Sequence, residues 1–167
     1  MPAVTLRSVE PHESPLVFSF LTLAARMAES DEPIQKALVD EQLTKYWQAW
    51  GRPGDRGIVA IRELDGLPVS CAWVRQLPPG DDYFLEDGVL ELAFGTVPSE
   101  RGQGVGTRAL TSLIEACRPR AKGISLSVRA DNPAVRLYRR LGFETLSEIV
   151  NRVGTQSLVM KLDFSER

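Results

Sequence analysis

The sequence is poor in histidine and cysteine: His12, Cys71 and Cys117 are the only residues of these two types among 167. Structural zinc sites need several such ligands at close spacing, and hydrolytic triads need a histidine beside the nucleophile. We therefore expect neither a metal site nor a histidine triad. Both cysteines lie within apolar patterns, "VSCAWV" and "LIEAC", which favours two buried, reduced thiols over a disulfide.

Long apolar runs are also missing, since no stretch approaches the roughly 18 residues that span a bilayer. The first residues do not join a basic segment to an apolar one, as a secretory leader would. The net charge of −2 gives no electrostatic reason to expect nucleic acid as a partner. With 43% hydrophobic and 25% charged residues, the composition is typical of a globular protein, and the length suits a single domain over residues 1–167. We expect a cytoplasmic protein without membrane or nucleic-acid partners.

Hydrophobic periodicity predicts alternating strands and helices. The expected strands cover residues 3–9, 57–64, 68–77, 89–98, 124–130, 144–150 and 156–164, and the expected helices cover residues 13–30, 30–51, 105–118 and 132–142. Asp65-Gly66 is a strong signal for a tight hairpin, and Gly142 suits the C-terminal cap of a helix. This order predicts a mixed α/β fold in which helices pack on a sheet.

The helix expected at residues 30–51 is the most detailed of these predictions. Ser30 or Asp31 is expected to cap it, Pro33 fits its first turn, and Gly51 can close it. The spacing of apolar residues predicts a buried inner face on this helix. The residues of that face are Ile34, Leu38, Val39, Leu43, Tyr46, Trp47 and Trp50.

Three glycines in five residues, within "RGQGVG", lie between an expected strand and an expected helix. The N–H groups of such a turn, at the positive end of a helix dipole, form a ready site for an anion such as a pyrophosphate. A Walker loop is excluded because the segment has no lysine, and a dinucleotide fingerprint is excluded because Thr107 takes the place of the third glycine. What remains is the pattern Arg101-x-x-Gly104-x-Gly106, with a plain strand-to-helix turn as the structural alternative.

Together with the later "NPAVRLYRRLGF", this pattern resembles the GNAT superfamily of acyl-CoA-dependent N-acyltransferases. In that superfamily a loop of the form R/Q-x-x-G-x-G/A, after the fourth strand, holds the CoA pyrophosphate. The two motifs occur in the expected order with a strand between them, and the resemblance is strongest from Glu91 to Phe143. It implies a mixed, mostly antiparallel sheet of about seven strands with helices on both faces. It also implies acetyl-CoA as co-substrate.

The resemblance assigns three groups of residues to acetyl-CoA. Residues of the glycine loop hold the pyrophosphate, the end of the fourth strand pairs with the pantetheine arm as an added strand would, and one later side chain touches the CoA arm. The three groups are Arg101, Gly102, Gln103, Gly104, Val105, Gly106 and Thr107; Gly95, Thr96 and Val97; and Asn132. For Asn132 the alternative is a helix N-cap and nothing more.

Aminolysis of a thioester needs a base for the amine, a donor for the tetrahedral oxyanion and an acid for the departing thiolate. Strand alternation puts Glu91 on the same face as the small residues Ala93 and Gly95, which leaves room for a substrate. The resemblance makes Glu91 the base, directly or through water, a backbone N–H near Gly95 the oxyanion donor, and Tyr138 the acid beside the sulfur. The alternatives are an ion-paired or solvated Glu91 and a core Tyr138. Direct transfer is expected because neither cysteine lies in a motif.

The acceptor is expected to be an amine on a small molecule or a peptide, and the resemblance allows a homodimer. Four acids favour a cationic amine and five aromatic residues can wall an apolar pocket, unless the acids are merely solvated and the tryptophans are core. These residues are Asp81, Asp82, Glu86 and Asp87, and Trp47, Trp50, Trp73, Tyr83 and Phe84. Two other classes stay open: a non-catalytic acyl-CoA sensor with a blocked acceptor site, and a partner-binding α/β domain.

Overall fold

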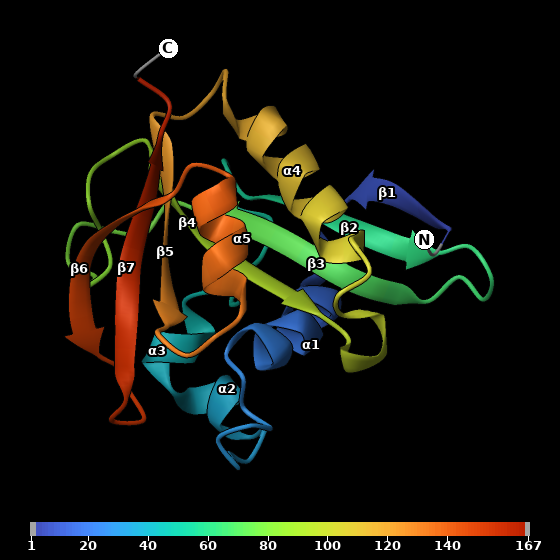
Figure 1. The fold of residues 1–167 in the computed structure, drawn as a ribbon, viewed down its shortest axis with the longest axis horizontal. Coiled ribbons are helices and arrows are strands. Elements are labelled where there is room, and N and C mark those ends of the chain that lie inside the picture. The colour runs from blue at the N-terminus through green and yellow to red at the C-terminus, as the bar shows by residue number, and fades with distance from the viewer. Residues whose placement is uncertain (1–2, 166–167) are drawn as a thin grey trace. The chain divides into compact units, whose positions relative to one another are not determined.

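The structure is a computed structural model that describes residues 3–165 (Figure 1). Its strands are β1 (Val4–Ser8), β2 (Arg56–Arg62), β3 (Pro68–Arg75), β4 (Val89–Thr96), β5 (Gly123–Arg129), β6 (Glu144–Val150) and β7 (Gln156–Asp163). Its helices are α1 (Ser14–Ala24), α2 (Lys36–Val39), α3 (Glu41–Thr44), α4 (Val105–Cys117) and α5 (Ala134–Arg140), with a short 3₁₀ helix, η1 (Pro98–Glu100).

The strands form one seven-stranded sheet in the order β1-β2-β3-β4-β5-β7-β6. Strands β4 and β5 are parallel, whereas the pairs β1–β2, β2–β3, β5–β7 and β6–β7 are antiparallel. The prediction of a mixed, mostly antiparallel sheet is therefore confirmed. The seven expected strands and the expected helices at α4 and α5 are each confirmed to within a residue or two at their ends.

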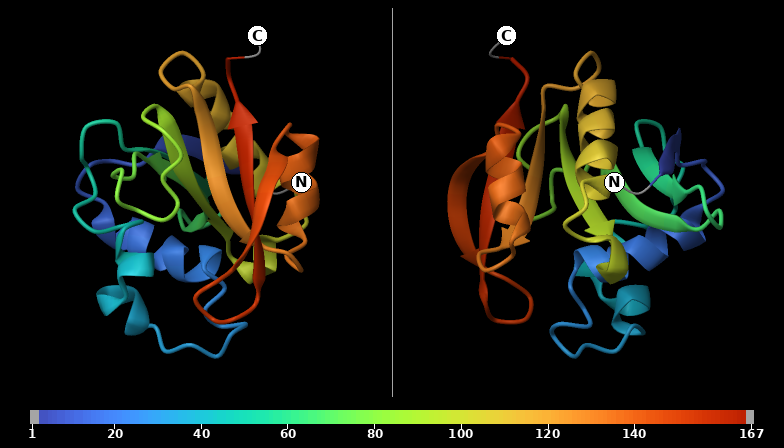
Figure 2. Two further views of the ribbon diagram at one scale, coloured as in Figure 1. Left: turned by 90° about the vertical axis from the view of Figure 1, so that its left-hand side faces the viewer. Right: turned by 45° about the vertical axis from the view of Figure 1, so that its right-hand side comes forward.

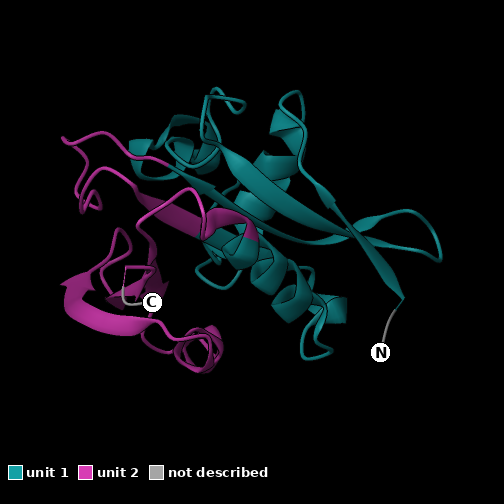
Figure 3. Ribbon diagram, turned by 90° about the horizontal axis from the view of Figure 1, so that it is seen from above, with its two compact units in different colours: residues 1–75, 93–115 teal, residues 76–92, 116–167 magenta. Residues whose placement is uncertain are grey.

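Two compact units make up the chain, and Figure 3 colours them separately. Unit 1 consists of residues 1–75 and 93–115, and unit 2 consists of residues 76–92 and 116–167. Strand β4 contributes to both, since its residues up to 92 belong to unit 2 and the rest belong to unit 1. The single domain expected for the whole chain stays a prediction.

In unit 1, helices α1 and α4 cover opposite faces of β4 (Figures 1 and 2). A Cβ atom built at Gly95 would lie 3.0 Å from the carbonyl oxygen of Phe20 in α1, and one built at Gly106 in α4 would lie 2.6 Å from Cζ of Phe94. Because Phe94 and Gly95 are consecutive strand residues, they face opposite sides. Helices on both faces are thus confirmed. The core beneath α1 includes Val17, Phe20, Leu21, Met27, Leu43, Tyr46, Trp50, Cys71 and Trp73.

The continuous helix predicted for residues 30–51 is wrong. Asp40 has an extended backbone (φ −77°, ψ 118°) that separates α2 from α3, and its side chain accepts a hydrogen bond of 2.9 Å from the N–H of Gln42. The predicted cap at Ser30 or Asp31 is also wrong, since α2 begins after Gln35 and Asp31 has a positive φ.

The break at Asp40 also changes which residues are buried. Ile34, Leu38 and Val39 are 55%, 53% and 77% exposed, whereas Leu43 and Trp50 are buried as expected. Helical periodicity assigns one inner face only while the helix is continuous, so the positions before Asp40 do not share the buried face of those after it.

A buried arginine joins β3 to the segment that follows α3. The side chain of Arg75 is 1% exposed and forms a forked pair with Asp55, with Nη2 to Oδ2 at 2.7 Å and Nε to Oδ1 at 3.2 Å. Its remaining donors reach the backbone carbonyls of Lys45, Gln48 and Ala49 at 3.1, 2.8 and 3.3 Å. All five guanidinium N–H groups therefore have acceptors, which is what a buried arginine requires.

In unit 2, strands β5, β7 and β6 form an antiparallel group with α5 beside it (Figure 2). The predicted hairpin through "NRVGT" is confirmed. Gly142 closes α5 with a φ of +101°, and the N–H of Phe143 donates to the carbonyl of Tyr138 at 3.0 Å, as in a Schellman cap.

Both cysteine thiols are buried, as expected. Burial raises the pKa of the Cys71 thiol well above its ordinary value, so this thiol stays protonated. Within residues 3–165, no helix has both the length and the apolar character needed to cross a membrane.

Candidate active site

The glycine loop follows β4 and η1 directly and leads into α4. Gly102 and Gly104 have φ angles of +75° and +83°, a backbone region that strongly favours glycine. The N–H of Arg108 donates to the carbonyl of Gly104 at 3.1 Å. In a helix that begins this way, the preceding N–H groups of the first turn have no acceptor within the helix. The loop and the first turn of α4 therefore offer N–H groups and a helix dipole to an anion.

Gly106 has a different role from the two glycines before it. A Cβ atom at this position would lie 2.6 Å from Cζ of Phe94 and 2.7 Å from Oγ1 of Thr96, both in β4. Such distances are too short for any side chain, so glycine is needed for α4 to approach the strand this closely. The third glycine therefore holds the helix N-terminus against β4 and does not serve the turn.

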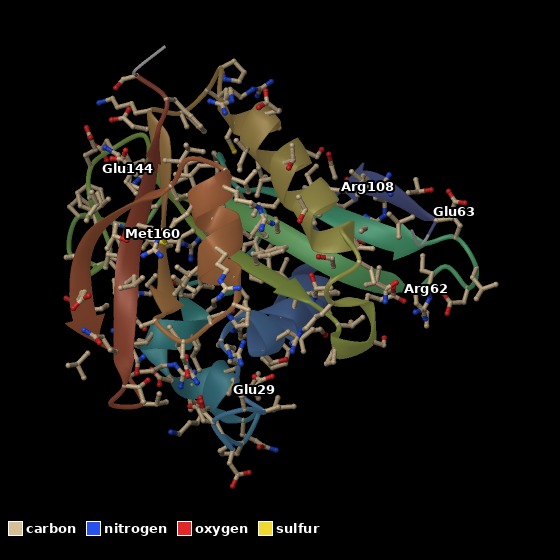
Figure 4. All side chains as sticks on the ribbon, viewed as in Figure 1. Glu29, Arg62, Glu63, Arg108, Glu144 and Met160 are labelled. Atoms are coloured by element: carbon tan, nitrogen blue, oxygen red, sulfur yellow. The ribbon has the colours of Figure 1, made fainter. Side chains whose placement is uncertain are left out.

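Polar side chains brace the loop from within unit 1. Nε of Arg101 donates to the carbonyl of Thr96 at 3.1 Å, and its Nη1 lies 3.7 Å from the carboxylate of Glu29. The side chain of Gln103 donates to the carbonyl of Ser99 at 3.1 Å. Arg108, labelled on α4 in Figure 4, is exposed near the start of the helix. Arg101 and Gln103 thus hold the loop through backbone carbonyls.

The end of β4 packs more tightly than the sequence predicted. Ser70 in β3 donates to the carbonyl of Gly95 at 3.1 Å, and the N–H of Val97 donates to the carbonyl of Val69 at 2.9 Å. The small residues Ala93 and Gly95 were expected to leave room for a substrate, but the backbone of α1 lies against Gly95 and Ala93 belongs to the core. That expectation is wrong, because the absent side chain makes space for a helix.

Glu91 lies in unit 2, where it is 3% exposed. Oγ of Ser125 donates to Oε1 of Glu91 at 3.2 Å, and the two residues are direct partners in the parallel pairing of β4 with β5. Tyr83 is hydrogen-bonded to Ser127, two residues along β5, and its pKa is raised by burial and by the nearby Glu91 charge. Because Glu91 is buried, the alternative that it is merely a solvated strand residue is excluded. Ser125 and Ser127 were missed, because their role depends on strand register.

Tyr138 and Asn132 also belong to unit 2. Tyr138 is 6% exposed, its ring meets that of Phe143 edge-on at 5.7 Å, and burial raises the pKa of its phenol above the ordinary value. Oδ1 of Asn132 accepts a hydrogen bond of 2.9 Å from the N–H of Ala134 at the start of α5. Asn132 thus accepts the first N–H of α5 from the position before the N-cap residue Pro133, and its contact with CoA stays a prediction.

Two of the four acids before β4, Asp81 and Glu86, make interactions within unit 2. The carboxylate of Glu86 lies 3.5 Å from Nζ of Lys122 and 3.7 Å from Nζ of Lys161, and Asp81 accepts from the N–H of Tyr83 at 2.8 Å. Among the aromatic residues offered as a pocket wall, Trp50 and Trp73 are core residues of unit 1. Residues 3–165 contain no group of three or more His, Cys, Asp and Glu side chains that can hold a metal ion.

Known structures share this fold over nearly the whole chain. A GCN5-related N-acetyltransferase from Kribbella flavida is 23% identical, with 96% of this chain and 98% of that chain covered and a TM-score of 0.71. The protein yncA from Salmonella typhimurium, solved with its cofactor acetyl-CoA, is 18% identical, with 99% of this chain and 96% of that chain covered and a TM-score of 0.70. The ribosomal-protein-alanine N-acetyltransferase from Brucella melitensis is 22% identical, with 95% of this chain and 99% of that chain covered and a TM-score of 0.69. A search of curated proteins gave no match.

These likenesses define the GNAT fold, and the family comparison goes further. Residues 22–143 match the model of the acetyltransferase (GNAT) family, which is well over half of the chain. The chain therefore belongs to the GNAT acetyltransferase family, whose co-substrate is acetyl-CoA. The recognition made from the glycine loop and the later motif is confirmed.

Proposed function

We propose that the protein is an N-acetyltransferase that moves the acetyl group of acetyl-CoA directly to a primary amine. Family membership supports the acyltransferase class and the co-substrate. The observation that carries the proposal is the loop, in which Gly102 and Gly104 turn the chain so that backbone N–H groups stand at the start of α4. Residues 101–107 are the proposed pyrophosphate site.

The pantetheine arm is proposed to pair with the end of β4. The pairing of β4 with β5 covers Val89–Glu91, and Gly95, Thr96 and Val97 come later in the same strand direction. The N–H of Val97 already donates to the carbonyl of Val69, and its own carbonyl accepts from the N–H of Glu100 at 3.0 Å, so the second lone pair of that carbonyl is the acceptor proposed for pantetheine. The backbone N–H near Gly95 is the proposed oxyanion donor, and Asn132 is the proposed side-chain contact to the CoA arm.

Glu91 is the proposed base. The hydrogen bond from Ser125 fixes one carboxylate oxygen, and burial of the side chain limits competing contacts with water. In the proposed reaction Glu91 accepts a proton from the acceptor ammonium, directly or through water, which leaves a neutral amine. The amine nitrogen then bonds to the thioester carbonyl carbon, the carbon–sulfur bond breaks, and the nitrogen releases its second proton to water, which leaves a neutral amide. Glu91 returns its proton to solvent before the next turnover.

Tyr138 is the proposed acid for the departing sulfur. Its raised pKa keeps the phenol protonated throughout the physiological range, so the proton is in place before the sulfur departs. A proton passed from Tyr138 to the thiolate yields the free thiol of CoA, and the phenol is restored from solvent. Neither cysteine is part of this proposal, since both are buried thiols outside the two motifs.

The setting of the reaction is part of the proposal. We propose that units 1 and 2 act as one domain over residues 1–167, which the passage of β4 through both units supports. A cytoplasmic location is supported by two buried cysteine thiols. The acceptor is proposed to be a small molecule or a peptide. Self-association as a homodimer is also proposed, and light scattering tests it.

The test begins with calorimetric titration of the protein with CoA and with acetyl-CoA. Competition between the two ligands for one site is the expected result, and the absence of heat for both would contradict the proposal. A screen of polyamines, peptides with a free N-terminal alanine and aminoglycosides then measures CoA release from acetyl-CoA. Binding without turnover on any acceptor would favour the non-catalytic acyl-CoA sensor.

A further inference from the structure

A buried carboxylate lies immediately before the glycine loop. Glu100, the last residue of η1, is 8% exposed and is followed by Arg101 and Gly102. The proposed ligand of the loop is a diphosphate, and a buried carboxylate so close to it repels it unless the charge is compensated. The loop therefore needs a cation beside Glu100.

Arg62, the last residue of β2, supplies that cation. Its Nη1 donates to Oε1 of Glu100 at 2.6 Å, while Nε and Nη2 donate to the carboxylate of Asp65 at 3.0 and 2.6 Å. The backbone of Arg62 is fixed by the hairpin, because its N–H donates to Leu67 and its carbonyl accepts from Gly66, both at 2.8 Å. The guanidinium is thus oriented by the β2–β3 hairpin, at whose end Figure 4 labels Arg62.

The two carboxylates held by Arg62 differ in their need for it. The side chain of Asp65 is 35% exposed, whereas that of Glu100 is 10% exposed. Water screens the charge of Asp65, but the more deeply buried Glu100 depends on its ion pair. Arg101 is not placed to substitute, since its guanidinium already reaches the Thr96 carbonyl and Glu29.

We propose that Arg62 is a positioning residue for acetyl-CoA, which holds Glu100 and compensates its charge so that residues 102–106 can accept the diphosphate. This role rests on the proposed function, because it takes the loop as the acetyl-CoA site. Arg62 acts through Glu100 and does not touch the ligand. Its effect is therefore expected in the affinity for CoA and not in the maximal rate.

The test is a double-mutant cycle on the dissociation constant for CoA, measured by titration calorimetry at low ionic strength. Arg62→Met removes the cation and keeps an unbranched apolar stem, and we expect the dissociation constant to rise about tenfold. Glu100→Gln removes the carboxylate charge at nearly constant shape and should change it less than about threefold. The combined variant should bind like Glu100→Gln alone, because no uncompensated carboxylate remains.

If Arg62 only supports Glu100 mechanically and does not compensate its charge, the double-mutant cycle has a different outcome. In that case the combined variant binds CoA as weakly as Arg62→Met or more weakly, and this result would overturn the proposal. Raising the ionic strength should narrow the gap between wild type and Arg62→Met, because salt screens the repulsion. Pantetheine, which lacks the diphosphate, should inhibit wild type and Arg62→Met equally.

Asp65→Asn is the matched control, since it removes the exposed partner of the same guanidinium and should leave CoA affinity within about twofold. Thermal melts check that each variant is folded, and Arg62→Gln replaces Arg62→Met in the same cycle if the latter is not. Wild-type protein that binds no CoA contradicts the proposed function. Wild-type binding with an equally tight Arg62→Met contradicts only the role of Arg62.

Discussion

Gly106→Ala tests how α4 is held against β4. The added methyl carbon would lie 2.6 Å from Cζ of Phe94 and 2.7 Å from Oγ1 of Thr96, whereas comfortable contacts between non-bonded atoms are about 3.5–4.0 Å. Thr96 has little freedom to move, since its Oγ1 lies 2.8 Å from Oγ of Ser70 in a hydrogen bond. Helix α4 must therefore shift away from the strand, or Phe94 must leave its rotamer.

The cost follows from two opposing terms. Overpacking of this kind costs about 1–3 kcal/mol, and the better helix propensity of alanine offsets up to about 1 kcal/mol. We expect the free energy of unfolding to fall by about 1–2 kcal/mol, which lowers the melting midpoint of a chain of this length by about 2–8 °C. Displacement of the first turn of α4 moves the N–H groups of the proposed diphosphate site, so the KM for acetyl-CoA should rise about tenfold.

Thermal melts and initial rates of CoA release give both quantities. Gly80→Ala is the matched control, because a Cβ atom there meets nothing within 4 Å, and its stability should stay within about 0.5 kcal/mol of wild type. A Gly106→Ala protein with the wild-type melting midpoint and the wild-type KM would refute the view that this glycine sets the approach of α4 to β4.

Five other predictions can be checked by enzyme kinetics, thermal melts and urea unfolding. Tyr138→Phe should lower kcat by about 10²-fold to 10⁴-fold without loss of CoA binding, and turnover within about threefold of wild type would make Tyr138 a packing residue. Folding raises the pKa of this phenol above its unfolded value of about 10. The stability that the protonated phenol contributes is therefore complete below about pH 10 and decreases as the pH rises above it. In melts between pH 9 and about 11, wild type should consequently lose more stability than Tyr138→Phe. Glu91→Gln should lower kcat by about 10²-fold or more with the KM for acetyl-CoA unchanged, and an unchanged kcat would leave proton removal to water. Gly104→Val should raise the KM for acetyl-CoA far more than that for the acceptor; its positive φ adds strain of about 1–2 kcal/mol, and equal effects on both would indicate misfolding. Arg75→Met should cost about 3–5 kcal/mol in urea unfolding, because it leaves the carboxylate of Asp55 buried without its partner, and a loss below about 1 kcal/mol would contradict this.

Local signals explain why most elements were predictable from the sequence. The Asp65-Gly66 signal correctly predicted a hairpin between β2 and β3, but not a two-residue turn, because the Arg62–Leu67 hydrogen bond closes a loop of four residues, 63–66, in which only Gly66 has a positive φ, of +73°. The helix predicted around Asp40 failed because the choice between a continuous helix and two short ones depends on tertiary packing. Asp40 suits the N-cap of a new helix as well as a position within one, and propensity alone does not decide between them.

The candidate site was predictable where its residues lie close together in the chain. The glycine loop is such a segment, and its place before α4 is confirmed. The partnership of Ser125 with Glu91 was not predictable, because it arises from the register of two parallel strands. Arg62 and Glu100 are likewise far apart in the chain, and only the fold brings their side chains to 2.6 Å. Residues that support a site through non-local contacts carry no local pattern.

The three glycines of the loop are required for two different physical reasons. Gly102 and Gly104 have positive φ angles, so the local backbone conformation requires glycine at these positions, and the spacing of the motif shows this in the sequence. Gly106 is required by Phe94 and Thr96, which come ten or more residues earlier and face α4 because of strand alternation. Gly95, on the opposite face of β4, admits the backbone of α1 in the same way. The position of the loop is therefore set by close packing on both faces of β4, and a substitution in either packing glycine should weaken acetyl-CoA binding without removing a single N–H group from the site.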